Sequence, residues 1–121
     1  MKNWSLLGLR LVIAAIFLLH GIPKLLNLAG TMNFFSGLGF PAFLGPVVGV
    51  LEVLGALAIL LGFWHKGATY VLALIIVVAI LAVQIPGALE RGISAGLERD
   101  VLILASILVL MTYGSGKLAV Q

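Results

Sequence analysis

The residue best placed to do chemistry is Glu52, a carboxylate near the middle of an apolar run over residues 44–63. A charge inside a membrane is costly, so such groups usually face protein or water instead of lipid. At ~100° per helical residue, Gly45, Gly49 and Ala56 share the face of Glu52, and small residues let a second helix approach closely. We therefore expect Glu52 to point inward as a proton carrier or a ligand-polarising group. The structural alternative is a buried carboxylate held in place by a cation.

Two cations on the first apolar run, Arg10 and Lys24, are candidate partners of Glu52 and candidate ligand-binding residues. They share one helix face if the helix continues past Pro23. At ~1.5 Å per residue, Arg10 would lie ~9 Å and Glu52 ~16 Å from the membrane face that holds the N-terminus. Helical side chains lean toward their own N-terminus, so Arg10 leans away from Glu52 and Lys24 leans toward it. Either cation can instead snorkel to lipid headgroups.

Further polar side chains are expected at the opposite membrane face, called side two here; side one holds the N-terminus. His20 and Gln84 end two apolar runs there, and Asp100 opens another. Their structural alternatives are interfacial hydrogen bonding, helix–helix contact and a favourable helix dipole at the acidic N-terminus of the last run. We predict a polar pocket that opens on side two. Its expected lining is His20, Lys24, Gln84 and Asp100, with Glu52 as the floor.

The composition requires that these residues be carried by membrane helices. The chain is 63% hydrophobic and 9% charged, with a mean hydropathy of +1.29, whereas a soluble domain is about half apolar and a quarter charged. The seven Lys and Arg residues form no basic cluster of the kind that nucleic acids require. The lipid bilayer is therefore the expected partner, and nucleic acid is not.

Cofactor chemistry is narrowed by the absence of cysteine, which removes thiolate catalysis, disulfide exchange and Cys-based metal sites. His20 and His65 are expected on opposite membrane faces, ~30 Å apart, and cannot share one iron. We expect no metal site and no covalently bound cofactor.

Four runs approach the ~20 residues that a helix needs to cross a ~30 Å hydrocarbon core. We predict spans at about residues 4–21, 44–63, 68–85 and 97–113. Pro23 is expected to kink or end the first span, and Pro86-Gly87 to end the third. Long continuous apolar runs favour helices over a barrel. The predicted fold is all-α, an integral membrane four-helix transmembrane bundle.

The predicted connections differ in character. Residues 24–43 are apolar but interrupted by glycines, which suggests a short helix lying in the membrane interface. Residues 64–67 form a tight reversal with the interfacial aromatic Trp64, and residues 86–96 form a polar connection with Glu90 and Arg91.

Orientation in the membrane is weakly specified because the positive charges tie. Side one would hold Lys2, Lys66 and Lys117, and side two Lys24, Arg91 and Arg99. Arg10, near side one, gives a slight preference for a multi-pass cell-membrane protein with both termini in the cytoplasm. The tie also permits dual insertion.

Several short motifs in a fixed order resemble those of the DoxX-like family of small four-helix membrane proteins. They are Arg10, Gly21-Ile22-Pro23-Lys24-Leu25, Gly39-Phe40-Pro41, Gly49-Val50-Leu51-Glu52-Val53-Leu54-Gly55, Leu61-Gly62 and Gly114-Ser115-Gly116. The resemblance covers nearly the whole chain and implies a single transmembrane domain over residues 1–121. Two departures stand out: Gln84 replaces a His found in many relatives, and Lys117-Leu118-Ala119 replaces their Ser-Leu-Asp.

The resemblance implies a membrane subunit of a quinone-linked redox system, such as thiosulfate-to-quinone oxidation, or a part of a thiol-stress complex. A quinone or other lipid-soluble ligand would then bind around Glu52, and a redox partner protein is expected. One alternative is a scaffold or assembly factor without catalytic activity, in which Glu52 is only an internal pin. Another is a small proton-coupled transporter acting as a homodimer, although small multidrug transporters carry their essential carboxylate in the first helix. Whether the chain is itself an enzyme stays open.

Overall fold

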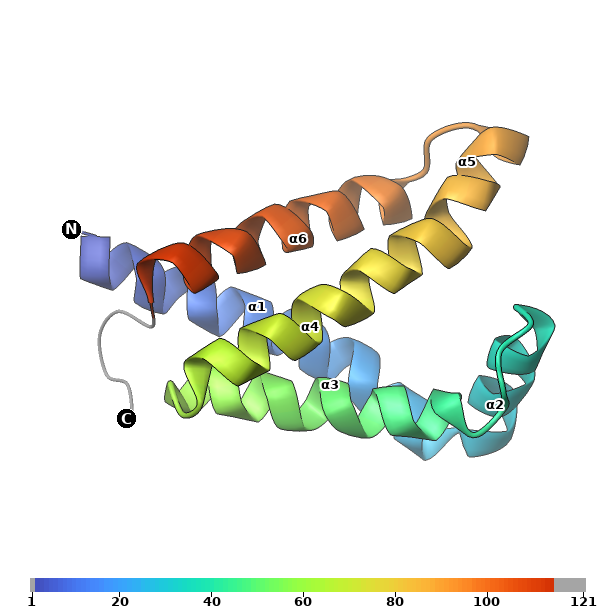
Figure 1. The fold of residues 1–121 in the computed structure, drawn as a ribbon, viewed down its shortest axis with the longest axis horizontal. Coiled ribbons are helices and arrows are strands. Elements are labelled where there is room, and N and C mark those ends of the chain that lie inside the picture. The colour runs from blue at the N-terminus through green and yellow to red at the C-terminus, as the bar shows by residue number, and fades with distance from the viewer. Residues whose placement is uncertain (1, 115–121) are drawn as a thin grey trace.

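The protein is described by a computed structural model of residues 2–114, with side chains from Trp4 onward. This part of the chain is helical and contains no strand, which confirms the all-α part of the predicted fold (Figure 1). The chain order is α1 Lys2–Leu26, α2 Leu28–Gly37, α3 Leu44–Leu61, α4 His65–Ala79, the π-helix η1 Ile80–Gln84, α5 Ile85–Arg91 and α6 Ala95–Tyr113. Ser115, Gly116 and Lys117, used above for the motif and the charge count, lie outside the described residues.

Three helical stretches of the described chain are long and apolar enough to cross a membrane: Trp4–Leu26, Leu44–Leu61 and His65–Arg91. Helix α6 has 19 residues but carries Glu98, Arg99 and Asp100 near its start. Three of the four predicted spans, at about residues 4–21, 44–63 and 68–85, therefore match helical stretches that are long and apolar enough to cross a membrane. Helix α6 nonetheless packs against both α4 and α1.

The predicted stop at Pro86-Gly87 is wrong, and the first helix does not end at Pro23. Helix α1 continues through Pro23 to Leu26. Membrane helices tolerate an internal proline where neighbouring groups satisfy the carbonyl that loses its donor. The third helical stretch passes Pro86 and ends at Arg91. Here the π-helix η1 shifts the bonding, so that the N–H of Ile85 donates to the carbonyl of Ile80. Pro86 then falls in the first turn of α5, where its missing N–H costs little.

The connections also differ from the prediction in length. The expected short helix between the first two spans is present as α2, in which no residue is buried. The tight reversal is shorter than predicted, because Gly62 (φ 73°) and Trp64 (φ 49°) turn the chain in the left-handed region and α4 begins at His65. The predicted polar connection over residues 86–96 is helical up to Arg91, and Ser94 caps α6 by accepting a hydrogen bond from the N–H of Leu97 at 3.1 Å.

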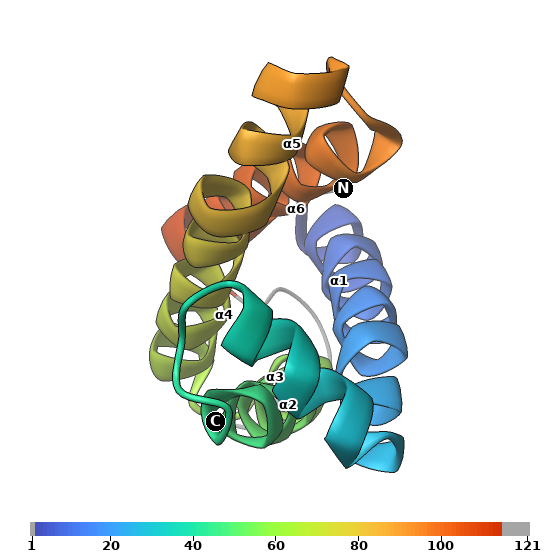
Figure 2. The same cartoon turned by 90° about the vertical axis from the view of Figure 1, so that its right-hand side faces the viewer.

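The long helices form a ring in which α1 packs on α3, α3 on α4, α4 on α6 and α6 back on α1. Figure 1 shows α3 and α4 close together at the reversal over residues 62–64 and diverging toward α5. We call the reversal end the closed end and the α5 end the open end; they correspond to side one and side two. Figure 2 shows α2 lying between the diverging helices at the open end. The buried apolar core is Leu6, Ile13, Ala14, Phe17, Ala56, Ile59, Ala68, Leu72, Ile76, Ile103, Ile107 and Leu110.

Candidate functional site: a cavity at the open end

The site begins with a close crossing of α1 and α3. Gly21, Gly49 and Glu52 are all buried at this crossing. A Cβ atom added to Gly21 would lie 2.9 Å from Val53 Cγ2 and 3.1 Å from the carbonyl oxygen of Gly49. The glycine faces predicted from the sequence therefore meet, as small residues allow, and they carry Glu52 inward beside α1.

Lys24 and Glu52 form an ion pair at this crossing. Lys24 Nζ donates to Glu52 Oε1 at 2.6 Å and to the carbonyl of His20 at 3.4 Å. The Glu52 side chain is 5% exposed and that of Lys24 is 26% exposed. The structure thus selects Lys24 over Arg10 as the partner, as expected from the lean of helical side chains toward the helix N-terminus.

A cavity of about 490 Å³ lies between the diverging helices and has this ion pair in its wall. Its volume is within the range of ~300–1,000 Å³ typical of small-molecule sites. Most of its wall is apolar and comes from α1, α2, α3, α4, η1 and α6. The polar lining residues are His20, Lys24, Glu52, Gln84, Arg99 and Asp100.

A second polar group in the cavity wall is centred on Asp100 of α6, which is 4% exposed. Gln84 Nε2 donates to Asp100 Oδ2 at 3.1 Å, and Arg99 Nε donates to Asp100 Oδ1 at 3.1 Å. Gln84 is the last residue of η1, and π-helical turns are frequent at functional sites. Gly96 has no side chain, and an added Cβ would lie 3.0 Å from Gln84 Oε1. That glycine lets Gln84 approach α6 closely enough to reach Asp100.

His20 is the remaining polar lining residue, and its own helix holds its ring. Its Nδ1 donates to the carbonyl of Ile16 at 2.7 Å, which leaves Nε2 of the neutral ring as a hydrogen-bond acceptor. His20 therefore adds a hydrogen-bond acceptor to a wall that also holds the ammonium group of Lys24.

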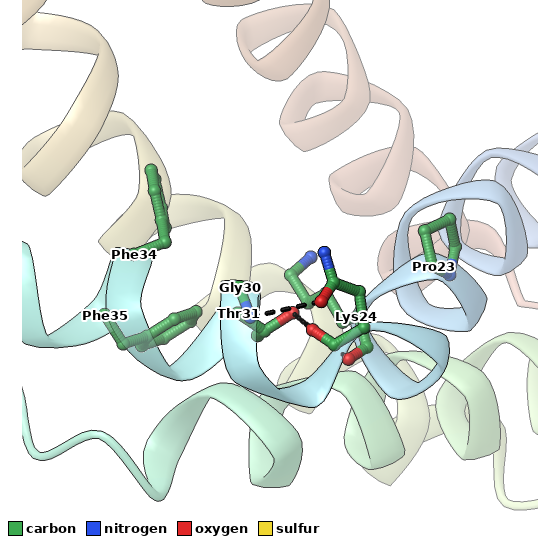
Figure 3. Close-up of a pocket in the computed structure, with 7 residues that line it drawn as sticks. Pro23, Lys24, Gly30, Thr31, Phe34 and Phe35 are labelled. Atoms are coloured by element: carbon green, nitrogen blue, oxygen red, sulfur yellow. Dashed lines mark hydrogen bonds between the residues drawn. The ribbon is translucent and has the colours of Figure 1, made fainter.

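A smaller hollow of about 360 Å³ adjoins the cavity where α1 meets α2 (Figure 3). The two share Lys24, Phe34 and Phe35 in their linings. Thr31 Oγ1 donates to the carbonyls of Lys24 at 3.1 Å and Asn27 at 2.9 Å, which ties α2 to the end of α1. The rings of Phe34 and Phe35 meet edge to face, 6.0 Å apart. Helix α2 thus supplies an aromatic wall between the cavity and the outside.

Two polar residues singled out in the sequence lie away from the cavity, at the closed end. Arg10 is 1% exposed and is not among the lining residues, so the structure does not bring it to the predicted pocket. His65 is also buried, and its Nε2 donates to the carbonyl of Leu110 at 2.6 Å. Arg10 is therefore left out of the proposed site.

The structure brings together the five other predicted site residues and adds members that sequence reasoning missed. Arg99 was counted only as a topology charge, yet it pairs with Asp100 in the cavity wall. Phe35 and Phe40 also line the cavity, with their rings 6.3 Å apart. Their aromatic clustering within the apolar 24–43 segment was an available signal. No group of three or more His, Cys, Asp or Glu that could hold a metal occurs among residues 2–114.

The fold and the site together define a helical membrane protein with an internal cavity between its helices. The sequence profile named DoxX matches residues 5–85, and the chain belongs to the DoxX family. This confirms the family resemblance seen in the motifs.

Named relatives extend the match over most of the chain. A Bacillus subtilis protein named "Putative oxidoreductase CatD" is 30% identical over 113 residues, which cover 93% of this chain and 81% of that protein. The Escherichia coli protein named "Inner membrane protein YqjF" is 35% identical over 63 residues, or 52% of this chain and 48% of that protein. An uncharacterized Haemophilus influenzae protein is 29% identical over 116 residues, or 95% and 85% of the two chains. No solved structure gives a significant match.

Proposed function

We propose that the protein is the membrane subunit of a quinone-linked redox system and that it binds a quinone or another lipid-soluble ligand in the cavity at the open end. The observation that carries the proposal is a cavity of about 490 Å³ with largely apolar walls and a partly buried ion pair, Lys24–Glu52, in one of them. An apolar pocket with a few convergent polar groups is the usual form of a ligand site. The name of the Bacillus subtilis relative, an oxidoreductase, agrees with this class.

The proposal places the protein in the bilayer with four spans, α6 being the fourth, and with both termini in the cytoplasm. At ~1.5 Å per residue, α6 is ~28 Å long and matches a ~30 Å hydrocarbon core. Arg99 is 47% exposed on its side chain and lies in the second turn of α6, where it can reach the headgroups. Asp100, one residue further on, is buried toward the cavity and away from lipid.

The residues of the cavity fit a quinone, whose carbonyl oxygens accept hydrogen bonds and, in the reduced form, become hydroxyl groups that also donate them. Lys24 would donate to one of these oxygens from the α1–α3 wall. Glu52, held 2.6 Å from Lys24, would accept a proton at a carboxylate oxygen and return it. A bound quinone supplies two-electron, two-proton chemistry. Because the chain has no cysteine, the proposal assigns thiol and metal redox centres to a partner protein in the membrane.

The test is mass spectrometry of what stays bound after gentle extraction from the native membrane. Wild-type protein is compared with Glu52→Gln and with the matched control Glu90→Gln, whose carboxylate is 76% exposed on α5. We expect a quinone or a similar amphiphile in the wild type and the control, reduced several-fold in Glu52→Gln.

Three other outcomes count against the proposal. If all three proteins are free of ligand and a stable partner protein co-purifies, the protein is better explained as a scaffold or assembly factor, in which Glu52 has only a structural role. Proton-coupled uptake by reconstituted vesicles would instead support a transporter acting as a homodimer. Equal ligand in all three proteins would move the binding site away from Glu52.

A further inference from the structure

The cavity has two separate polar groups of side chains, which we call poles, on different pairs of helices. The first pole is Lys24 and Glu52, from the α1–α3 crossing. The second pole is Gln84, Arg99 and Asp100, from η1 and the start of α6. In Figure 2, α5 and the start of α6 lie at the top of the view, and α2 and α3 lie below them. The rest of the cavity lining is mainly apolar and includes Val48 of α3 and Ile75 of α4.

Each pole is compensated in charge. The first pairs one ammonium with one carboxylate, and the second pairs one guanidinium with one carboxylate. With His20 neutral, the lining charges sum to zero, because the two cations Lys24 and Arg99 balance the two anions Glu52 and Asp100. A ligand that carries a net charge would enter an apolar cavity with no opposite charge free to receive it, which is costly.

Each pole also offers a donor and an acceptor. Lys24 donates beside the acceptor Glu52, and Gln84 donates beside the acceptor Asp100. A polar group that arrives at either pole can therefore be received whether it accepts or donates a hydrogen bond. Buried polar groups need such partners, and leaving one without a partner costs about as much as a lost hydrogen bond.

We infer that the cavity selects an uncharged ring with one polar group at each end, held between the Lys24–Glu52 pole and the Gln84–Asp100–Arg99 pole. This deepens the proposed function, on which it rests, by defining the ligand class and by adding Arg99 and its pole as the second contact. The inferred site would bind a neutral ring with two polar ends more tightly than an anionic or cationic amphiphile of the same size.

The first experiment measures binding of three bicyclic probes to purified wild-type protein. These are para-naphthoquinone, which is neutral with two carbonyls; tetralone, which is neutral with one; and the sulfonate of para-naphthoquinone, which is an anion. We expect para-naphthoquinone to bind about fivefold more tightly than tetralone, the value of one hydrogen bond of ~1 kcal/mol. Gln84→Met removes the donor of the second pole at nearly constant volume and should erase most of this preference.

The second experiment tests charge compensation through a gain of binding, which a misfolded variant cannot produce. Glu52→Gln leaves Lys24 uncompensated in the first pole, and Asp100→Asn leaves Arg99 uncompensated in the second. Each should bind the sulfonate at least about tenfold more tightly than the wild type, because a free cation now faces the anion in a poorly solvated cavity. The matched control Glu90→Gln should show no gain.

The outcomes separate this inference from the proposed function. If para-naphthoquinone binds but no better than tetralone, or if neither carboxylate variant gains the sulfonate, the two-pole inference is wrong while the quinone site stands. Wild-type protein that binds the sulfonate as tightly as the neutral quinone contradicts charge compensation. If no probe binds the wild type, the proposed function and the inference fall together.

Discussion

The closed and open ends of the helix ring contain similar residue types in different settings. The closed end has a buried Arg10, a buried His65 and a buried Thr69. His65 and Thr69 donate to backbone carbonyls: His65 to Leu110 at 2.6 Å, and Thr69 to His65 at 2.9 Å. The open end has Lys24, His20 and other polar groups that line a cavity.

The contrast shows that burial alone does not mark a functional residue. Arg10 is more deeply buried than Lys24, yet it lines neither the cavity nor the smaller hollow. At the open end the same chain diverges, and side chains meet an internal space instead of a neighbouring helix. A substitution at the closed end should therefore change stability, and one at the open end should change ligand binding. The four predictions below test that division, from the largest expected effect to the smallest.

The largest effect is expected from Leu110→Ala at the closed end, where the side chain is fully buried. Removing a buried leucine side chain leaves a cavity and costs about 2–5 kcal/mol of unfolding free energy. The measurement is equilibrium unfolding in detergent, with Leu108→Ala, which is half exposed on the same helix, as the matched control. Ligand retained per folded molecule should not change. A loss of ligand without a loss of stability would contradict the assignment of stability to the closed end and ligand binding to the open end.

Next is Lys24→Met, which removes the cation beside the buried carboxylate of Glu52. Breaking one partner of a buried pair costs ~3–5 kcal/mol, and since Lys24 is partly exposed we expect about 1–3 kcal/mol with loss of ligand. Adding Glu52→Gln should restore part of the stability without restoring ligand binding. Lys66→Met, at an exposed position of α4, is the matched control. If the double variant is as unstable as the sum of the two single changes, the ion pair is not coupled.

The two histidines give a smaller but more specific contrast. His65→Leu removes one of two donors to the carbonyl of Leu110, the other being the N–H of Gly114 at 2.9 Å, and should cost ~0.5–1.5 kcal/mol. His20→Leu removes a ring that bonds only its own helix in the described chain, so stability should change by less than ~1 kcal/mol while ligand binding weakens several-fold. Unfolding and binding are measured on both variants. The reverse pattern would exchange the roles assigned to the two ends.

The smallest effect is expected from Glu90→Gln. Its carboxylate lies 3.8 Å from Arg91, and both side chains are more than three-quarters exposed. Exposed pairs of this kind contribute ~0–1 kcal/mol. Unfolding should therefore be within error of the wild type, and ligand retention unchanged. A measurable loss of ligand here would extend the site beyond the cavity.

Much of the site could be predicted from helical geometry. The spacing of Gly45, Gly49 and Glu52 predicted a buried face for the carboxylate, and the structure buries Glu52. Side-chain lean favoured Lys24 without excluding Arg10, and the structure pairs Lys24 with Glu52. The gathering of polar residues at side two followed from span lengths alone.

What the sequence could not give depends on how helices meet or continue. The divergence of α4 from α3, which creates the cavity, is a tertiary feature with no local signature. The passage through Pro86 depends on the π-helix η1, whose shifted hydrogen bonds place the proline in a new first turn. Arg99 was missed because its charge suited a helix end at the headgroups equally well. Span four stays a prediction because α6 begins with three charges.

The most direct test of the central claim, that the open end holds the ligand, is photo-crosslinking with an azido-quinone followed by peptide mapping. Labelling should fall on cavity-lining segments such as residues 16–20, 47–52, 74–84 and 99–103, and excess unlabelled quinone should abolish it. Labelling spread over exposed positions outside these segments, such as Tyr70 and Leu108, and unaffected by the competitor, would contradict the claim.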